Sequence, residues 1–390
     1  MPDTKISALT AATAVGLTDI VPIVSGGANY QATGQQLAGI ADNQTAYNFT
    51  PAFTHGIRRK IAQALSGRAA CKLGFFGDST TFGTTGGTSL SGNIKVSRPY
   101  RLYQYLKGMG LNVRFDGVTW ASFVTADGNP SSTDARFKAA SGWTTSNANG
   151  AAPGNLTNPI TFTPDGVWDT AVITYYDVSA GTLRLQVDSE TAVDTTLTGS
   201  GTWKTATVTT TAGAAGAKAV KVFMTTGRFR AIDCYNSATP DLRILNLGHP
   251  GIGFSADPTT GTQLSKAITV MGIDVLTTMM GVNDFSSNAA STWQGYYNQH
   301  IGQITGCSHM IEVPLMNTSV TDAIQNTYVT AMYAIADASA LPLVNWRKRY
   351  GDTNALVSSN GWQTDALHPN SDTYYDQGAY LGKRLVGMHG

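Results

Sequence analysis

Apolar positions follow different periods in different regions of the chain. From about residue 54, short apolar runs alternate with segments whose apolar residues recur every three or four positions, which is typical of strands and helices in turn. The expected helices are His55–Leu65, Pro99–Gly108, Thr262–Met271, Trp293–Thr305, Val320–Ala338 and Asp372–Val386. The expected strands are Cys71–Phe76, Leu242–Leu247, Ile273–Met280 and His309–Pro314. This alternation predicts an α/β domain.

A period of two replaces this pattern between about 112 and 238. Four segments there alternate apolar and polar residues and are separated by turns rich in Gly, Ser and Asp: 170–176, 182–188, 205–209 and 219–224. Such spacing predicts an antiparallel β-sandwich. We therefore expect one α/β domain, residues 51–111 and 239–390, interrupted by an inserted β-module over 112–238.

The first 50 residues form a small segment of their own. Asp19–Val24 is expected to form a short strand that ends at Ser25-Gly26-Gly27, and Thr33–Leu37 is expected to open a short helix. A segment of this length buries too little surface to fold alone. Met1–Lys5 lacks the basic and apolar regions of a signal peptide, so we expect no ordinary secretion.

Composition excludes several classes of protein. Of 390 residues, 26 are Lys or Arg and 25 are Asp or Glu, so the net charge is +1. This balance argues against binding nucleic acid through phosphate neutralisation. Hydrophobic residues make up 42%, which argues against wholesale disorder, and no apolar run is long enough to predict a membrane span. The low charged fraction of 13% leaves a surface rich in Gly, Thr, Ser and Asn, which suits β-structure and contact with polysaccharide.

The cysteine count argues against disulfides and metal. Cys71, Cys234 and Cys307 are an odd number without ligand spacing, so we expect free thiols. We expect no metal and no organic cofactor. Five histidines are given no catalytic role: His55, His249, His300, His309 and His389.

Three loop motifs each follow an expected strand. Gly77-Asp78-Ser79 places a serine where parallel strands of α/β folds carry their sites. The segment 246–251, Asn-Leu-Gly-His-Pro-Gly, offers glycine N–H groups that a substrate oxygen can approach closely. The amide of Asn283, in Gly-Val-Asn-Asp, can donate to a developing oxyanion. Taken alone, none of these three motifs outweighs its interpretation as a plain turn.

A fourth motif, Asp365-Ala-Leu-His368-Pro369, lies near the C-terminus. Its spacing brings a carboxylate and an imidazole to one side of a turn, where the carboxylate orients the ring of a general base. Alone, such a pair is more often a surface contact.

Taken in order, the four motifs resemble those of the SGNH hydrolases, the GDSL family. The resemblance implies a three-layer α/β/α, flavodoxin-like domain. It further implies Ser79 as nucleophile, His368 as base and Asp365 as the residue that orients it. The oxyanion hole would comprise the N–H groups of Ser79 and Gly251 and the Asn283 side chain, with Gly248 as the rival to Gly251. Thr80 replaces the leucine of the GDSL form.

The inserted module points to the substrate. SGNH enzymes with such an insertion resemble carbohydrate esterases, whose insert helps to bind glycan. Five aromatic residues of this region offer flat faces for sugar rings, although each is also suited to the sandwich core: Trp143, Trp168, Tyr175, Tyr176 and Trp203.

Residues 5–9 and 18–24 resemble N-terminal segments of bacteriophage tail fibres and tailspikes. Together with the esterase motifs, this resemblance implies an enzyme of the virion that removes O-acetyl groups from a bacterial surface polysaccharide such as O-antigen or capsule. It implies attachment to tail or baseplate proteins through residues 1–50, folding in the host cytoplasm and a homotrimer. Two alternatives remain open: a cellular SGNH esterase or lipase of broad specificity, and a receptor-binding protein without catalysis.

Overall fold

The computed structural model describes most of the chain. The described residues are 20–25, 28–33, 45–85, 94–119, 134–139, 143–146, 150–152, 155–211, 213, 216–254, 264–285 and 288–386. Every statement about the fold refers to these residues.

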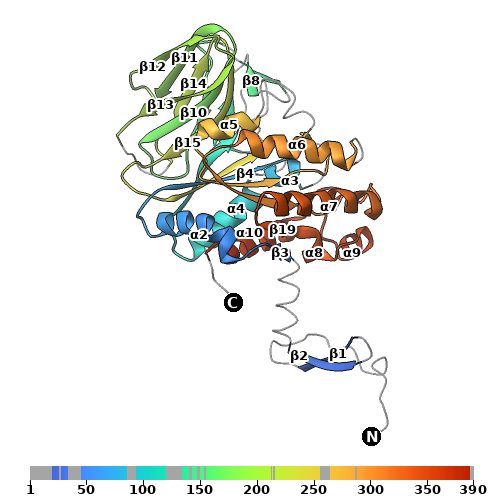
Figure 1. The fold of residues 1–390 in the computed structure, drawn as a ribbon. Helices are drawn as coiled ribbons and strands as arrows, with labels where there is room; N and C mark the ends of the chain where they lie inside the picture. The colour runs from blue at the N-terminus through green and yellow to red at the C-terminus, as the bar shows by residue number, and fades with distance from the viewer. Residues whose placement is uncertain are drawn as a thin grey trace.

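Six parallel strands form the centre of the molecule (Figure 1). They are β4 (Cys71–Gly77), β5 (Val113–Thr119), β16 (Leu242–Gly248), β17 (Val275–Met279), β18 (Ser308–Val313) and β19 (Leu343–Asn345). Their spatial order is β5-β16-β4-β17-β18-β19, or 2-3-1-4-5-6 when they are numbered along the chain. β4 carries apolar side chains to both faces, because both faces are covered by helices.

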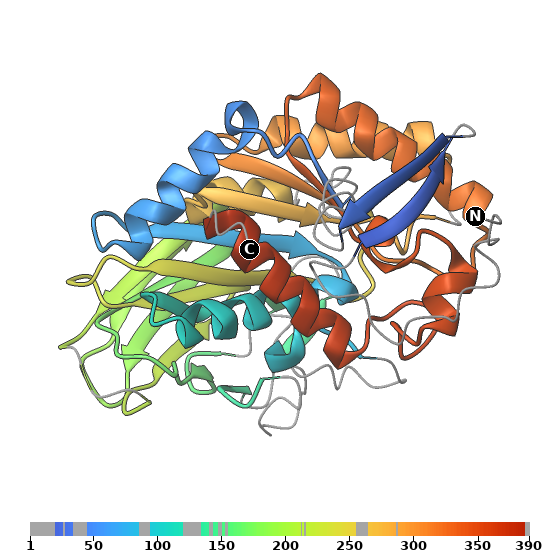
Figure 2. The same cartoon turned by 90° about the horizontal axis from the view of Figure 1, so that it is seen from below.

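Helices cover the sheet on both faces, so the domain has three layers. Figure 2 shows α2 (Pro51–Leu65), α10 (Ser371–Val386) and α4 (Arg98–Gly108) side by side on one face. The other face carries α5 (Leu264–Met271), α6 (Ala290–Gln303) and α7 (Asp322–Ala338). These are the six expected helices, and their ends lie within a few residues of the expected positions. The four expected strands of the α/β part are likewise confirmed.

Short elements complete this domain. They are α3 (Ser79–Phe82), η2 (Ile94–Val96), α8 (Trp346–Tyr350) and α9 (Asn354–Ser359). Periodicity did not predict them, because so few residues do not show a helical repeat.

The inserted β-structure shares a sheet with the α/β domain. β15 (Arg228–Tyr235) pairs antiparallel with β5, and the sheet continues into β10 (Thr170–Asp177) and β13 (Thr202–Thr209). A second sheet comprises β6 (Phe137–Ala139), β9 (Ile160–Phe162), β11 (Ala180–Val187), β12 (Val193–Thr198) and β14 (Val220–Met224). The short strands β7 (Thr144–Ser146) and β8 (Gly150–Ala152) pair with each other, and β8 also joins β15.

The four expected strands of the sandwich are confirmed as β10, β11, β13 and β14. β5 lies within the range expected for the insert, yet it is a parallel strand of the central sheet. The expected boundaries at 111/112 and 238/239 remain predictions. The sandwich and the α/β domain are nevertheless joined by continuous hydrogen bonding through β5 and β15.

The aromatic residues of the insert pack inward. Trp143, Trp168 and Tyr175 are at most 3% exposed, and the indole nitrogens of both tryptophans donate to backbone carbonyls. Trp203 is also buried and contacts the half-buried ring of Tyr176, with ring centroids 5.2 Å apart. Of the two alternatives considered for these residues, packing in the core is therefore confirmed for Trp143, Trp168 and Tyr175, which offer no open face to a sugar. A strand pattern shows alternation but not which face is covered.

Three strands lie in the described residues that precede α2. β1 (Ile20–Ser25) and β2 (Ala28–Thr33) make a separate antiparallel hairpin, which confirms the expected strand. β3 (Ala46–Tyr47) pairs antiparallel with β19 at the edge of the large sheet. The helix expected over Thr33–Leu37 falls mostly outside the described residues, and Thr33 itself lies in β2.

The three cysteines are free thiols, as expected, with Cys71 and Cys234 buried and Cys307 half-buried. Burial raises the pKa of Cys71 to about 12 and that of Cys307 to about 11, so neither is a reactive thiolate at neutral pH. No helix in the described part of the chain is both long and apolar enough to cross a membrane.

Candidate active site

Three of the four motifs lie at one edge of the sheet. β4, β16 and β17 are adjacent and parallel, so the loops that follow their carboxyl ends meet at the same edge. These loops carry Ser79, Gly251 and Asn283. The chain order of the strands reverses around β4, and in open α/β sheets such a reversal leaves a crevice outside the carboxyl ends of the strands.

Ser79 is the first residue of α3, directly after β4. The side chain of Asp78 caps this helix, because its Oδ1 accepts hydrogen bonds from the Thr80 N–H (2.9 Å) and the Thr80 hydroxyl (2.7 Å). Gly77 is required by close packing, since a Cβ there would collide with Thr81 Oγ1 and the Met279 carbonyl. The strand therefore turns sharply into a helix that presents Ser79.

The structure brings Ser79, His368 and Asp365 together, although 289 positions of sequence separate Ser79 from His368. His368 Nε2 lies 2.9 Å from Ser79 Oγ, and His368 Nδ1 lies 2.9 Å from Asp365 Oδ2. A carboxylate bonded to Nδ1 favours the tautomer with its proton on Nδ1. Nε2 is then the lone-pair nitrogen that accepts the serine hydroxyl proton.

Asp365 also holds the shape of its own turn. Its Oδ1 accepts from the N–H groups of Leu367 (2.8 Å) and His368 (2.7 Å). Partial burial acts to raise the pKa of Asp365, but the hydrogen bonds from the His368 ring and from these two N–H groups outweigh it and lower the pKa overall. Asp365 therefore stays ionised and keeps orienting the imidazole well below neutral pH.

The two candidate glycines of the second loop differ in structure. The Gly248 N–H already donates to Asn246 Oδ1 (2.9 Å), and a Cβ on Gly248 would lie 2.6 Å from Phe82 Cα. Gly248 is thus a packing residue. Gly251 is exposed with a φ of 76°, and the position of its Cβ is open. It lies in a turn closed by the Ile252 N–H and the His249 carbonyl.

Two backbone donors of the proposed oxyanion hole have no acceptor in the described part of the chain: the N–H groups of Ser79 and Gly251. The Ser79 N–H opens α3, where the first N–H groups have no intrahelical acceptor. Such donors are the kind that an oxyanion hole requires.

Asn283 connects the second and third loops. Its Nδ2 donates to the Ile252 carbonyl (2.9 Å), next to Gly251. Asp284 binds the same segment, since its Oδ2 accepts from the Phe254 N–H (3.1 Å). The Asn-Asp pair therefore fixes the loop that contains Gly251.

Two buried polar residues support the site beyond those for which the motifs predicted a role. Asn246 of β16 donates to the carbonyls of Thr81 and Phe82 and so holds α3 from beside. Its signal in the sequence was a polar residue inside an apolar strand. Asp78 is fully buried, and burial raises its pKa to about 6 despite the bonds from Thr80. Its capping role was readable only once α3 was known.

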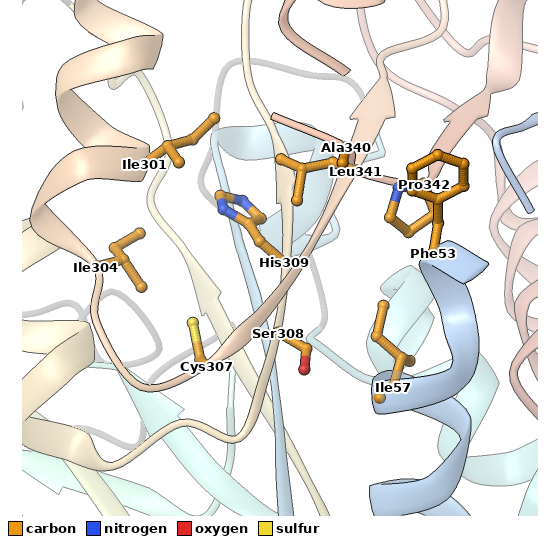
Figure 3. Close-up of a pocket in the computed structure, with 11 residues that line it drawn as sticks. Phe53, Ile57, Ile301, Ile304, Cys307, Ser308, His309, Ala340, Leu341 and Pro342 are labelled. Carbon is orange, nitrogen blue, oxygen red and sulfur yellow. The ribbon is translucent and has the colours of Figure 1, made fainter. Parts of the chain in front are cut away.

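The cavity in Figure 3 lies elsewhere. It has a volume of about 290 Å³ and is lined mainly by apolar side chains of α2 and the end of α6. Cys307 and the first two residues of β18, Ser308 and His309, also line it. Because Ser308 begins β18, this cavity is at the amino-terminal edge of the sheet, opposite Ser79. Within the described residues, no three His, Cys, Asp or Glu side chains gather to hold a metal ion.

No protein-family model matches this sequence, and no curated protein matches it either. Among solved structures, the chain is similar to a peptidoglycan O-acetylesterase, with a TM-score of 0.61 and 14% identity over 88% of this chain and 99% of that one. Weaker similarities include a family two carbohydrate esterase from Clostridium thermocellum (TM-score 0.28, 13% identity, 63% of this chain and 96% of that one). Another is a lipase/acylhydrolase from Enterococcus faecalis (TM-score 0.31, 19% identity, 38% and 77%).

The likeness to the first of these structures shows the fold. The chain shares its fold with that esterase and has a three-layer α/β/α architecture, as the motifs implied.

Proposed function

We propose that this protein is a serine esterase that removes O-acetyl groups from a bacterial surface polysaccharide. The observation that carries the proposal is the hydrogen-bonded series Ser79–His368–Asp365 at the carboxyl edge of the sheet. A serine hydroxyl is a weak nucleophile until a base removes its proton, and here the base is in contact and correctly oriented.

The reaction follows from this geometry. Ser79 Oγ attacks the acetyl carbon while its proton passes to His368 Nε2. The carbonyl oxygen becomes an oxyanion that accepts from the Ser79 and Gly251 N–H groups and from Asn283, each donor being worth roughly 10²–10³ in kcat. His368 then returns the proton to the departing sugar hydroxyl, which leaves acetyl-Ser79. Water, deprotonated by His368, attacks this ester and releases acetate.

A glycan substrate is supported by three observations. The structurally similar peptidoglycan O-acetylesterase acts, by its name, on an acetylated bacterial glycan. The Asp365 side chain is 37% exposed and Gly251 is exposed, so this part of the site faces solvent. An acetyl group on a long polymer can reach only a site that is open in this way. The chain is also poor in charged residues, at 13% of the sequence.

We infer further that the enzyme belongs to a phage tail, forms a homotrimer, attaches through residues 1–50 and acts outside the cell at the bacterial surface. The support is the resemblance of residues 5–9 and 18–24 to tail-fibre segments. Deleting residues 1–50 should leave esterase activity in place and abolish binding to tail or baseplate proteins. Light scattering of the full chain tests the trimer. Unchanged partner binding after the deletion would favour a cellular esterase.

The direct test is acetate release from O-acetylated capsule, O-antigen and peptidoglycan by the wild type beside Ser79→Ala. We expect release from at least one glycan, lost in the variant, whose folding should be unaltered because the Ser79 hydroxyl bonds only to His368 among the described residues. Ser79-dependent hydrolysis of a small aryl acetate without release from any glycan would leave an esterase with another substrate. Inactivity on both would favour the receptor-binding protein.

A further inference from the structure

The loop that follows β18 contains none of the four motifs, yet it contacts two of them. This loop, residues 314–321, begins where β18 ends, at the same carboxyl edge as Ser79. Its residues Met316, Asn317 and Thr318 are joined by hydrogen bonds to the segments that carry the base and the side-chain oxyanion donor. The loop therefore connects two parts of the site that are remote in sequence.

Thr318 holds the turn between Asp365 and His368. The Ala366 carbonyl, inside that turn, accepts from the Thr318 N–H (2.7 Å) and from the Thr318 hydroxyl (3.2 Å). Gln363 fastens the start of the same segment, because its Nε2 donates to the Met316 carbonyl (2.6 Å). The segment that carries the base is therefore bound to the loop after β18 at two points.

Asn317 holds the loop of the oxyanion donor. Its Nδ2 donates to the Val282 carbonyl (3.1 Å), one residue before Asn283. Asn317 is itself fixed by Gln325, a fully buried residue of α7. Gln325 accepts from the Asn317 N–H (3.0 Å) and donates to the Asn317 carbonyl (3.0 Å).

We propose that Asn317 and Thr318 are positioning residues for ester hydrolysis, which hold the His368 turn and the Asn283 loop in register with each other. This inference rests on the proposed function. His368 and Asn283 must act on the same tetrahedral intermediate, but the loops that carry them are far apart in the sequence. A displacement of about 1 Å in such a group is enough to slow a reaction substantially.

The first test uses Thr318→Val, which removes the hydroxyl and keeps the backbone hydrogen bond, so the variant should fold. We expect kcat for an aryl acetate, and the rate at which a fluorophosphonate labels Ser79, to fall roughly five- to tenfold with KM unchanged, as the loss of one hydrogen bond predicts. Thr318→Ser should restore both rates. Thr330→Val, on the exposed side of α7, is the matched control and should have no effect.

A second measurement does not depend on activity. The ¹⁵N resonances of the His368 ring, assigned by their loss in His368→Gln, report which nitrogen carries the proton. Thr318→Val should reduce the Nδ1–H form relative to the wild type, whereas Asn317→Ala should slow labelling of Ser79 and leave the tautomer unchanged.

Wild-type rates and an unchanged tautomer in Thr318→Val would overturn the positioning role. A wild-type protein whose Ser79 resists the fluorophosphonate would instead contradict the proposed function, while the tautomer comparison would still decide the role of Thr318.

Discussion

At the scale of single residues, burial and hydrogen bonds make residues of the same type behave differently within the site. The pKa of Asp365 is lowered, despite partial burial, by the hydrogen bonds that this carboxylate accepts, while the pKa of Asp78, next to the nucleophile, is raised by burial. The two glycines of the second loop show a similar contrast. Gly251 provides an open turn, whereas Gly248 allows β16 to approach α3.

This contrast predicts different outcomes for two alanine substitutions. Gly248→Ala should destabilise the protein by about 3 kcal/mol or more and abolish activity, because the new Cβ collides with backbone atoms of Phe82 that cannot move independently. Gly251→Ala should cost about 1 kcal/mol, the strain of a left-handed conformation in an open position. Urea unfolding measures both. Equal destabilisation by the two substitutions would contradict the packing role of Gly248.

At the scale of elements, the nucleophile depends on the short helix α3, which cannot be stable alone. Asn246 holds its Thr81 and Phe82 carbonyls, and Arg98 of α4 donates to the Thr81 hydroxyl (3.3 Å). Arg98 is itself paired with Glu312 of β18 at 3.2 Å, and both side chains are fully buried. Three neighbouring elements therefore determine where Ser79 lies.

We expect Asn246→Leu to weaken this support. The substitution leaves buried carbonyl groups of α3 without a donor, which should lower the free energy of unfolding by about 2–4 kcal/mol and reduce kcat by displacing Ser79. Asn112→Leu is the matched control, because the Asn112 side chain donates to the Pro240 carbonyl at an exposed position. Unfolding curves and aryl acetate kinetics of both variants test this prediction. A similar small loss in the two variants would show that Asn246 does not hold α3.

At the scale of the whole molecule, the twelve-stranded sheet joins the parallel core to the inserted strands. The buried interior on one face of the sheet contains His300 and His309, which are connected through the Thr278 hydroxyl (3.1 and 2.8 Å). Burial lowers the pKa of His309 to about 4, and burial and the nearby His309 lower that of His300. Both rings are thus neutral in the folded protein at neutral pH.

Acid should therefore destabilise the fold through these histidines. The unfolded chain binds a proton at His309 with a pKa near 6.5, and the folded chain only near 4, so stability is present above pH 6.5 and falls as the pH drops toward 4. The lowered pKa of His309 therefore contributes about 3 kcal/mol to the free energy of unfolding at neutral pH, and this contribution is lost in acid. Asp78 has the opposite effect on stability. Its folded pKa of about 6 lies above the ordinary value of 3.8, so its contribution to stability rises as the pH falls.

The measurement compares urea unfolding of the wild type and His309→Gln at about pH 7.5 and about pH 4.5, on either side of most of this titration. The wild type should lose more stability than the variant between these two pH values, since only the wild type carries this histidine. Parallel losses in the two proteins would mean that His309 titrates normally.

Much of the fold was predictable from local pattern. The helices and strands of the α/β part were apparent because an apolar period of 3.6 or a short apolar run is a property of neighbouring residues. The sandwich strands were visible for the same reason. Short elements such as α3 and β19 were not, and neither was the pairing of β15 with β5, because strand pairing depends on residues far apart in the chain.

The sequence by itself determined the longer helices and strands, the order of the four motifs and the chemical types that they carry. Only the tertiary structure decided that His368 lies 2.9 Å from Ser79. It also decided that the Gly248 N–H donates to Asn246, whereas the Gly251 N–H has no acceptor among the described residues. It also decided that the aromatic residues Trp143, Trp168 and Tyr175 face inward, and that Thr318 holds the turn of the base. The physical reason is that residue types and periodicity are local, whereas distance, burial and hydrogen-bond partners arise when distant segments meet.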